Sequence, residues 1–186
     1  MRWPIIFFSL FVVVLQPVGH PARAGQDNPR LDRLFHSLVQ AKNQHQALLI
    51  ESRIWKIWLL AGDPAVDVEM ARGIDYLNAG DLESALTSFN KIIKMEPDLA
   101  EGWNKRATVY YLMGDLNRSV RDIEHTLALE PRHFGAFAGL GMIYLAIGDD
   151  HAALRAFEKV LKIDPYYGNV ENQVRRLRQK IKGQPT

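Results

Sequence analysis

The sequence contains no cysteine in its 186 residues. Disulfide bonds and catalysis by a thiol are therefore excluded. The cysteine that carries the lipid of a bacterial lipoprotein is absent as well. The chain must be stabilised by packing alone, and its length suffices for one domain with a buried core.

The sequence also lacks an apolar run long enough for a transmembrane helix, which needs about 20 apolar residues. The apolar run near the N-terminus covers only residues 5–15. It follows Arg2 and precedes a small-x-small motif at Ala22 and Ala24, which is the order found in a secretory signal peptide. We expect cleavage after Ala24 and a periplasmic protein with no membrane span. The alternative is that residues 1–24 stay attached as an anchor.

Without residues 1–24, the sequence has no excess of positively or negatively charged residues. The chain has 23 Lys and Arg against 21 Asp and Glu. Because Arg2 and Arg23 leave with the predicted signal peptide, the mature chain carries no net charge. The composition therefore gives no indication of nucleic-acid binding.

Signatures of catalysis and metal binding are missing too. There is no HExxH motif, no G-x-S-x-G motif and no glycine loop of the phosphate-binding type. The histidines of the predicted mature chain show no pairing on one helix, so we expect surface or turn residues rather than ligands. These are His36, His45, His125, His133 and His151. The sequence predicts neither an enzyme nor a protein with a cofactor or a metal.

An internal repeat is the strongest feature that is present. Four kinds of residue recur at intervals of 34. They are the tyrosines Tyr76, Tyr110 and Tyr144, the glycines Gly80, Gly114 and Gly148, the aspartates Asp81, Asp115 and Asp149, and the prolines Pro97, Pro131 and Pro165. The aspartates could form a three-acid site, or they could mark the same joint in three structural units.

The residue types at these positions favour the second interpretation, in which they mark the same joint in three structural units. Glycine suits the left-handed backbone that ends many helices, aspartate caps the following helix, and proline ends it. Apolar residues between these markers have helical spacing. We therefore expect two helices per unit, in units 66–99, 100–133 and 134–167. Small residues would let the helices cross closely at Ala85, Ser119 and Ala153, with Phe89, Ile123 and Phe157 filling each seam.

The third unit resembles the tetratricopeptide repeat (TPR) family. It carries seven of eight signature residues, namely Phe137, Leu140, Gly141, Tyr144, Ala153, Phe157 and Pro165, and departs at Val160. The first unit departs at Glu69, Arg72 and Ile92, and the second at Arg106, Ile123 and Thr126. The resemblance, which extends to small exported bacterial TPR proteins, implies an all-α, right-handed solenoid that acts as an interaction module.

Two flanking segments complete the domain. After a linker at 25–30, residues 31–65 are predicted to form a divergent helix pair that closes the N-terminal end, with Trp55 and Trp58 in the core. Residues 168–186 are predicted to form a cap helix and tail, with an apolar stripe at Val170, Val174, Leu177 and Ile181. The other face of this helix is basic, which also suits a weak contact with an anionic surface.

The TPR resemblance implies a partner groove on the concave face, lined by the first helix of each pair. The residues at its recurring places or beside them are Met70, Ile74, Leu77, Asn78, Glu101, Asn104, Lys105, Thr108, Tyr111, Ala138, Met142 and Leu145. TPR proteins that hold chaperone C-termini use a clamp of Lys, Asn and Arg. Met70 and Ile74 occupy two of those places here, and Gly135 and Gly139 occupy two others, so that clamp is absent.

The predicted groove is apolar, which suits an amphipathic helix or an extended apolar segment of a protein partner. The same residues could instead pack against neighbouring helices. Two other functions remain open. A receptor for a lipid would need an enclosed cavity of about 300 Å³ or more, and a structural homo-oligomer would associate through the solenoid ends.

Overall fold

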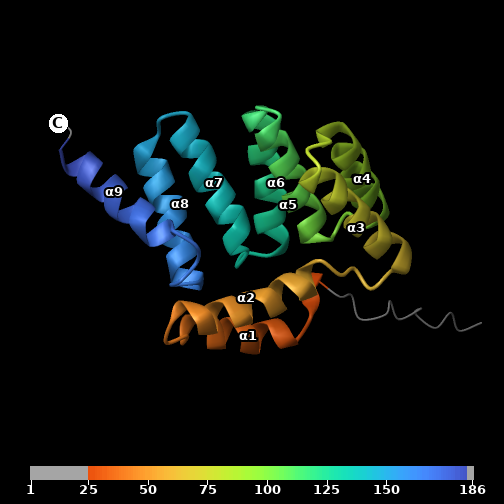
Figure 1. Ribbon diagram of the computed structural model, residues 1–186, viewed down its shortest axis with the longest axis horizontal. Helices are drawn as coiled ribbons and strands as arrows, with labels where there is room; N and C mark the ends of the chain where they lie inside the picture. The colour runs from red at the N-terminus through yellow and green to blue at the C-terminus, as the bar shows by residue number, and fades with distance from the viewer. Residues whose placement is uncertain (1–24, 184–186) are drawn as a thin grey trace, which may run out of the picture.

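A computed structural model describes residues 25–183 of the chain. The predicted signal peptide and its cleavage site at Ala24 lie outside these residues. The described part forms a short 3-10 helix and nine α-helices, with no strand (Figure 1). The helices are α1 (Arg30–Val39), α2 (Gln44–Trp58), α3 (Pro64–Asn78), α4 (Leu82–Met95), α5 (Ala100–Leu112), α6 (Leu116–Leu129), α7 (Phe134–Ala146), α8 (Asp150–Ile163) and α9 (Val170–Lys182). None of these helices has the length and apolar character needed to span a membrane.

Six of the helices form three antiparallel pairs, α3–α4, α5–α6 and α7–α8, which stand side by side in a row (Figure 1). Helix α9 packs against α8 at the end of the row, where Val170, Val174 and Leu177 are buried. The all-α solenoid with a C-terminal cap helix, expected from the sequence, is confirmed.

The turn inside each pair follows the expected chemistry. Gly80, Gly114 and Gly148 have φ angles of 77°, 79° and 80°, a region that glycine enters without steric cost. The carboxylate of each following aspartate accepts a hydrogen bond from the backbone N–H three residues later. The donors are Ser84 at 3.1 Å, Arg118 at 2.9 Å and Ala152 at 2.8 Å. Each aspartate thus caps its own helix.

The seam between paired helices is tightly packed. Phe89 is fully buried and Phe157 is 1% exposed. Each ring lies against a glycine of the partner helix. A Cβ atom added at Gly73 would lie 2.7 Å from the Phe89 ring, and one added at Gly141 would lie 2.5 Å from the Phe157 ring. These glycines therefore set how closely the helices cross.

The second pair closes its seam with an ion pair instead. Arg106 donates from Nε and Nη2 to both carboxylate oxygens of Asp122, at 2.7 and 2.9 Å, and Asp122 is buried. Such a bidentate pair is strong and directional. The arginine that interrupts the TPR pattern here thus joins the two helices.

The α1–α2 pair, which we call the hairpin, does not close the N-terminal end of the row. It crosses below the other helices (Figure 1) and shares a core with the third repeat and α9. The aromatic residues of that core are Phe35, Trp55, Trp58, Phe134, Phe157, Tyr166 and Tyr167. The expected position of the hairpin was therefore wrong, although Trp58, at 1% exposed, lies in the core as expected.

The surface of the first repeat offers a physical reason for this placement. Glu69 occupies the place of a signature aromatic residue, and its carboxylate binds Lys91 at 2.8 Å and Arg72 at 3.2 Å. The groove between α3 and α4 is lined mainly by polar residues. An apolar hairpin gains more by covering the aromatic residues at the base of the third repeat.

A buried pair of acids lies where the hairpin meets the third repeat. Glu51 of α2 and Asp164, which follows α8, are 7% and 0% exposed. Burial, followed by the charge of Asp164, raises the pKa of Glu51 to about 7. Burial also raises the pKa of Asp164. One oxygen of each carboxylate lacks a hydrogen-bond donor, so a proton held between the two side chains would satisfy both.

The tight seam predicts opposite effects of one substitution at two glycines of α7. Gly141→Ala should destabilise the protein by about 1–3 kcal/mol, because the new methyl group overlaps the Phe157 ring. Gly139→Ala is the matched control, since its Cβ would meet only Ile123 at 3.5 Å. It should be neutral or stabilising by up to about 1 kcal/mol, the helix preference of alanine over glycine. Urea unfolding measures both, and equal effects would contradict the seam geometry.

The buried acids predict that stability decreases as pH rises between about 5 and 8. The folded-state pKa of Glu51, about 7, lies above its ordinary value of 4.5, so the folded protein binds the proton more tightly than the unfolded chain. The benefit is complete below the ordinary value and is lost as pH passes through 7. Urea midpoints followed by tryptophan fluorescence should therefore decrease across this range.

Glu51→Gln provides the control, because its amide can donate to Asp164 at any pH. The variant should show a flatter dependence of the urea midpoint on pH. A slope equal to that of the wild type would show that the effect does not come from the acid pair.

Candidate functional site

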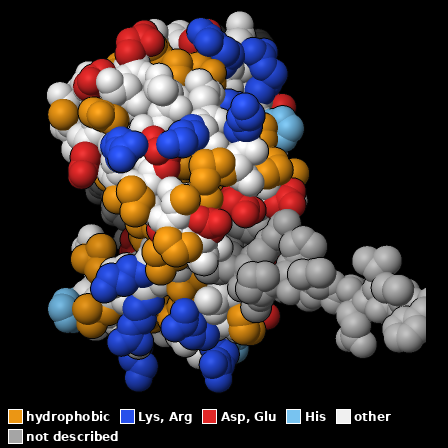
Figure 2. All heavy atoms as spheres, turned by 90° about the vertical axis from the view of Figure 1, so that its right-hand side faces the viewer, with side chains coloured by type: hydrophobic (Ala, Val, Ile, Leu, Met, Phe, Trp, Pro, Cys, Tyr) orange, Lys and Arg blue, Asp and Glu red, His pale blue; other side chains and the backbone are white. Residues whose placement is uncertain are grey.

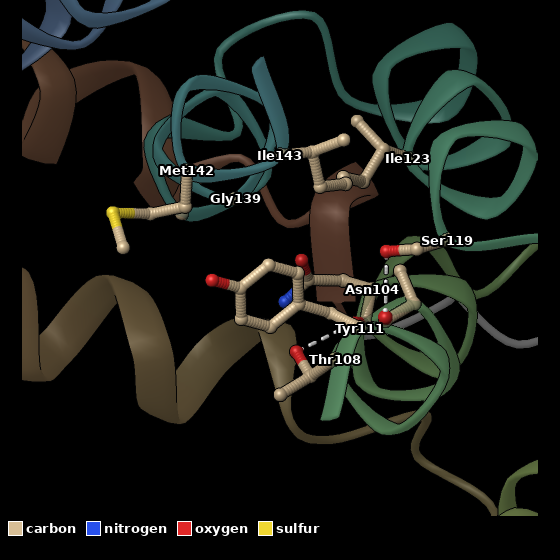
Figure 3. Close-up of a pocket in the computed structure, with 10 residues that line it drawn as sticks. Asn104, Thr108, Tyr111, Ser119, Ile123, Gly139, Met142 and Ile143 are labelled. Carbon is tan, nitrogen blue, oxygen red and sulfur yellow. Dashed lines mark hydrogen bonds between the residues drawn. The ribbon is translucent and has the colours of Figure 1, made fainter. Parts of the chain in front are cut away.

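The first helices of the three repeats form a continuous row, because α3 contacts α5 and α5 contacts α7. This row forms the concave face, on which a partner groove is predicted from the sequence. A cavity of about 160 Å³ opens on it between the second and third repeats. Its lining comprises Asn104, Ala107, Thr108 and Tyr111 of α5, Ser119 and Ile123 of α6, and Gly135, Gly139, Met142 and Ile143 of α7 (Figure 3).

The cavity exists because α7 presents glycine where α5 presents larger side chains. A Cβ atom at Gly139 would meet nothing closer than Ile123, so the wall of α7 is mostly bare backbone there. Tyr111 and Met142 lie at the mouth in Figure 3. Met142 is 43% exposed, a high value for an apolar side chain in a folded domain.

The polar groups of the lining are largely occupied. Ser119 Oγ donates to the carbonyl oxygen of Ala107 at 2.8 Å, and Thr108 Oγ1 donates to that of Asn104 at 3.1 Å. Asn104 donates to Glu101 at 3.0 Å. What the cavity offers is therefore mainly apolar contact. Small-molecule sites usually have about 300–1,000 Å³, so this cavity fits a side chain of a larger partner better than a lipid.

The structure divides the predicted groove residues into three groups. Asn104, Thr108, Tyr111 and Met142 come together in the cavity lining. Met70 is buried in the core of the first repeat, with Ile74 and Leu77 packed against that core, while Asn78 is exposed. Glu101 is buried, Lys105 is half-buried, and Ala138 and Leu145 pack against the core that contains the hairpin. Partner binding by any of them stays a prediction.

A buried charged network supports the floor of this face. Glu101, 1% exposed, lies 3.1 Å from Lys105 Nζ and 2.8 Å from His133 Nε2. Burial alone would raise the pKa of Glu101, but Lys105 and the hydrogen bond from His133 hold it below its ordinary value. His133 Nδ1 accepts a hydrogen bond from the N–H of Ala136 at 3.0 Å, so Nε2 carries the proton given to Glu101.

His133 also connects this network to the hairpin. Its ring stacks on Trp58, with centroids 4.1 Å apart, and Trp55 packs edge-on against it at 5.5 Å. His133 was expected to be a surface or turn residue; it lies in the turn before α7, but its side chain is fully buried and not on the surface. Its place at the start of α7, where a capping residue is needed, is the one local signal that could have indicated its role.

The hairpin contacts Gly135, one of the residues that line the cavity. The Trp55 ring lies against the backbone of Gly135, where an added Cβ would be only 2.6 Å away. Lys105 Nζ lies 5.4 Å from the centre of the same ring, which favours a cation–π contact. Helix α2 therefore shapes the concave face, a contribution that the repeat pattern did not indicate.

Catalytic chemistry finds little support in this arrangement. Within residues 25–183, no group of three or more His, Cys, Asp or Glu side chains could hold a metal ion. The repeated aspartates cap helices, and the buried Glu101 is paired with Lys105 and His133 and is not itself part of the cavity lining.

Comparisons with known proteins agree with the repeat. Residues 70–116 and 135–167 match family models described as tetratricopeptide repeat. A TPR repeat-containing protein of Rhizobium etli is 35% identical over 84 residues, which cover 45% of this chain and 41% of that protein. The chain thus spans about two fifths of the length of the relative it matches.

Solved TPR structures share the fold. The first TPR of Spaghetti (RPAP3), bound to an HSP90 peptide, has a TM-score of 0.60 at 20% identity, covering 63% of this chain and 94% of its own. The TPR2B domain of yeast Sti1, in a complex with pHsp70, has a TM-score of 0.57 at 16% identity, covering 62% of this chain and 97% of its own. MamA has a TM-score of 0.59 at 18% identity, covering 75% of this chain and 79% of its own. These likenesses show the tetratricopeptide repeat fold, and the two matched segments show that the chain contains tetratricopeptide repeats.

Proposed function

We propose that this protein is a non-enzymatic scaffold that binds a peptide or helix of a partner protein on its concave face. The observation that carries the proposal is the cavity between α5 and α7. It opens to solvent on the face formed by the first helices, it is lined mainly by apolar groups, and Met142 and Tyr111 stand at its mouth.

The chemistry of the lining indicates the kind of partner. The cavity is large enough for an apolar side chain, and the flexible thioether of Met142 can adapt to its shape. A partner segment with one bulky apolar residue, flanked by residues that contact Thr108 and Tyr111, fits these features. An amphipathic helix provides such residues at a spacing of three or four.

The structural neighbours support peptide binding in general, since RPAP3 and Sti1 are seen with segments of HSP90 and Hsp70. An acidic C-terminal segment is a poor candidate here, because glycine and apolar residues stand at four places of the carboxylate clamp. Gly135 faces Trp55, and Met70 is buried. The proposed partner is therefore apolar at its anchor and does not depend on a terminal carboxylate.

The proposed setting is the bacterial cell envelope, with the protein in the periplasm after cleavage at Ala24. This rests on the order of Arg2, the apolar run and the small-x-small motif in residues 1–24. Mass spectrometry of the protein isolated from cells would give its N-terminal residue, and a chain that begins at Met1 would contradict cleavage.

The cavity predicts that Met142→Glu weakens partner capture. A carboxylate at the mouth would need to be desolvated when an apolar side chain enters, which costs several kcal/mol for an unpaired charge. Pull-down from periplasmic extract, quantified by mass spectrometry, should show at least about a tenfold loss of the captured partner, equivalent to about 1.4 kcal/mol.

Met95→Glu is the matched control. Met95 is similarly exposed, at 39% against 43% for Met142, but lies at the end of α4 and away from the cavity. It should leave capture unchanged. Equal loss in both variants would indicate a general effect of charge, and unchanged capture by Met142→Glu would show that the partner binds elsewhere.

A further inference from the structure

We propose that the outer face of the α1–α2 hairpin binds an anionic phospholipid surface. This surface is separate from the concave face, and the proposal does not depend on the function proposed for that face. It rests on which residues α1 and α2 direct away from the third repeat.

Helix α2 has two sharply different faces. Ala47, Ile50, Ile54 and Trp58 are buried against α1 and the third repeat. The opposite face is exposed along the whole helix and comprises His45, Leu48, Leu49, Ser52, Arg53 and Lys56. Leu48 and Leu49 are 49% and 52% exposed, and Val39, at the end of α1, is 51% exposed. Three large apolar side chains thus stand in solvent near the tip of the hairpin.

Basic residues surround this apolar tip and continue along both helices. They are Arg30 and Arg33 of α1, Lys42 of the connecting loop, and Arg53 and Lys56 of α2, all exposed. Figure 2 shows Lys and Arg side chains gathered along the lower edge of the molecule, where the hairpin lies. The face therefore carries positive charge beside exposed apolar groups.

Few acidic residues offset this charge. Between residues 30 and 58 only Asp32 and Glu51 are acidic. Asp32 binds Arg132 at 2.7 Å, and Glu51 is buried in the interface with the third repeat. Burial also raises the pKa of Glu51 to about 7, which reduces its negative charge.

Leucine and valine flanked by Lys and Arg match the boundary between lipid headgroups and acyl chains. The cations are drawn to anionic headgroups, while the apolar side chains enter the outer part of the acyl layer. An acidic protein surface would satisfy the cations but would leave the three apolar residues without a nonpolar environment. The exposed residues of the hairpin include no Phe, Tyr or Trp on which nucleic-acid bases could stack.

The start of the described chain lies beside the same structure. Gly25 packs next to the backbone of Leu60 and Trp58, close to the C-terminal end of α2. The nine residues 16–24 separate it from the apolar run at 5–15. Fully extended, they reach at most about 30 Å. An exported chain would therefore bring the hairpin close to the membrane surface before its signal peptide is removed.

The test uses residues 25–186, which include the whole described fold and exclude the apolar run. Sedimentation with vesicles of phosphatidylglycerol and phosphatidylcholine is compared with sedimentation with phosphatidylcholine alone. Binding should require phosphatidylglycerol and decrease with salt, as expected for attraction between exposed charges. Binding that is equal for both vesicles, or no binding to either, would overturn the proposal.

Two sets of variants locate the surface. Replacing Arg33, Arg53 and Lys56 by Gln should lower the partition coefficient about a hundredfold, from roughly 1 kcal/mol per cation near an anionic surface. The matched control replaces Arg175, Arg176 and Lys182 of α9 by Gln, which removes the same charge from the other basic surface. That control should retain binding.

The apolar contribution is tested by Leu48→Gln with Leu49→Gln, which keeps every charge. This variant should also bind less, and vesicles should no longer shift the emission of a fluorophore attached through Ser52→Cys on the same exposed face. If only the α9 variant loses binding, the lipid contact belongs to the cap helix. If the leucine variant binds like the wild type while double-stranded DNA or heparin competes fully, the face recognises polyanions in general, and the lipid assignment is wrong.

Discussion

The architecture depends on the close crossing of two helices inside each repeat. In the first and third repeats an aromatic ring presses on a bare glycine of the partner helix, with no room for one more methyl group. That contact fixes the distance between the helices, and the glycine–aspartate turn fixes the point at which the chain reverses. Because both recur every 34 residues, successive pairs stack in the same way and their first helices form one face.

The candidate site arises where the second and third repeats depart from uniform packing. Arg106 and Asp122 close the seam of the second repeat with an ion pair, so Ile123 is available to the cavity wall. Gly135 and Gly139 then leave α7 bare opposite Thr108 and Tyr111. A cavity in a folded domain forfeits dispersion contacts, and a partner's side chain that enters this cavity would restore them.

Much of the fold could be read from the sequence because it depends on local, repeated signals. The turn glycines, capping aspartates and seam aromatics each act within one helix pair, and all took their expected places. The hairpin could not be placed in this way. Its position depends on long-range contacts of Trp55 and Trp58 with His133 and Phe134, about 75 residues further along the chain. The extent of the cavity could not be predicted for a related reason, since its lining combines residues of α5, α6 and α7.

The two faces of α2 give the hairpin two physical roles. Its inner face carries Trp55, which packs against Gly135 of the cavity lining, and Glu51, whose pKa is raised by burial and by the charge of Asp164. Its outer face carries Leu48, Leu49, Arg53 and Lys56. Since both faces belong to one helix, anything that holds the outer face also fixes the position of Trp55 against Gly135 of the cavity lining.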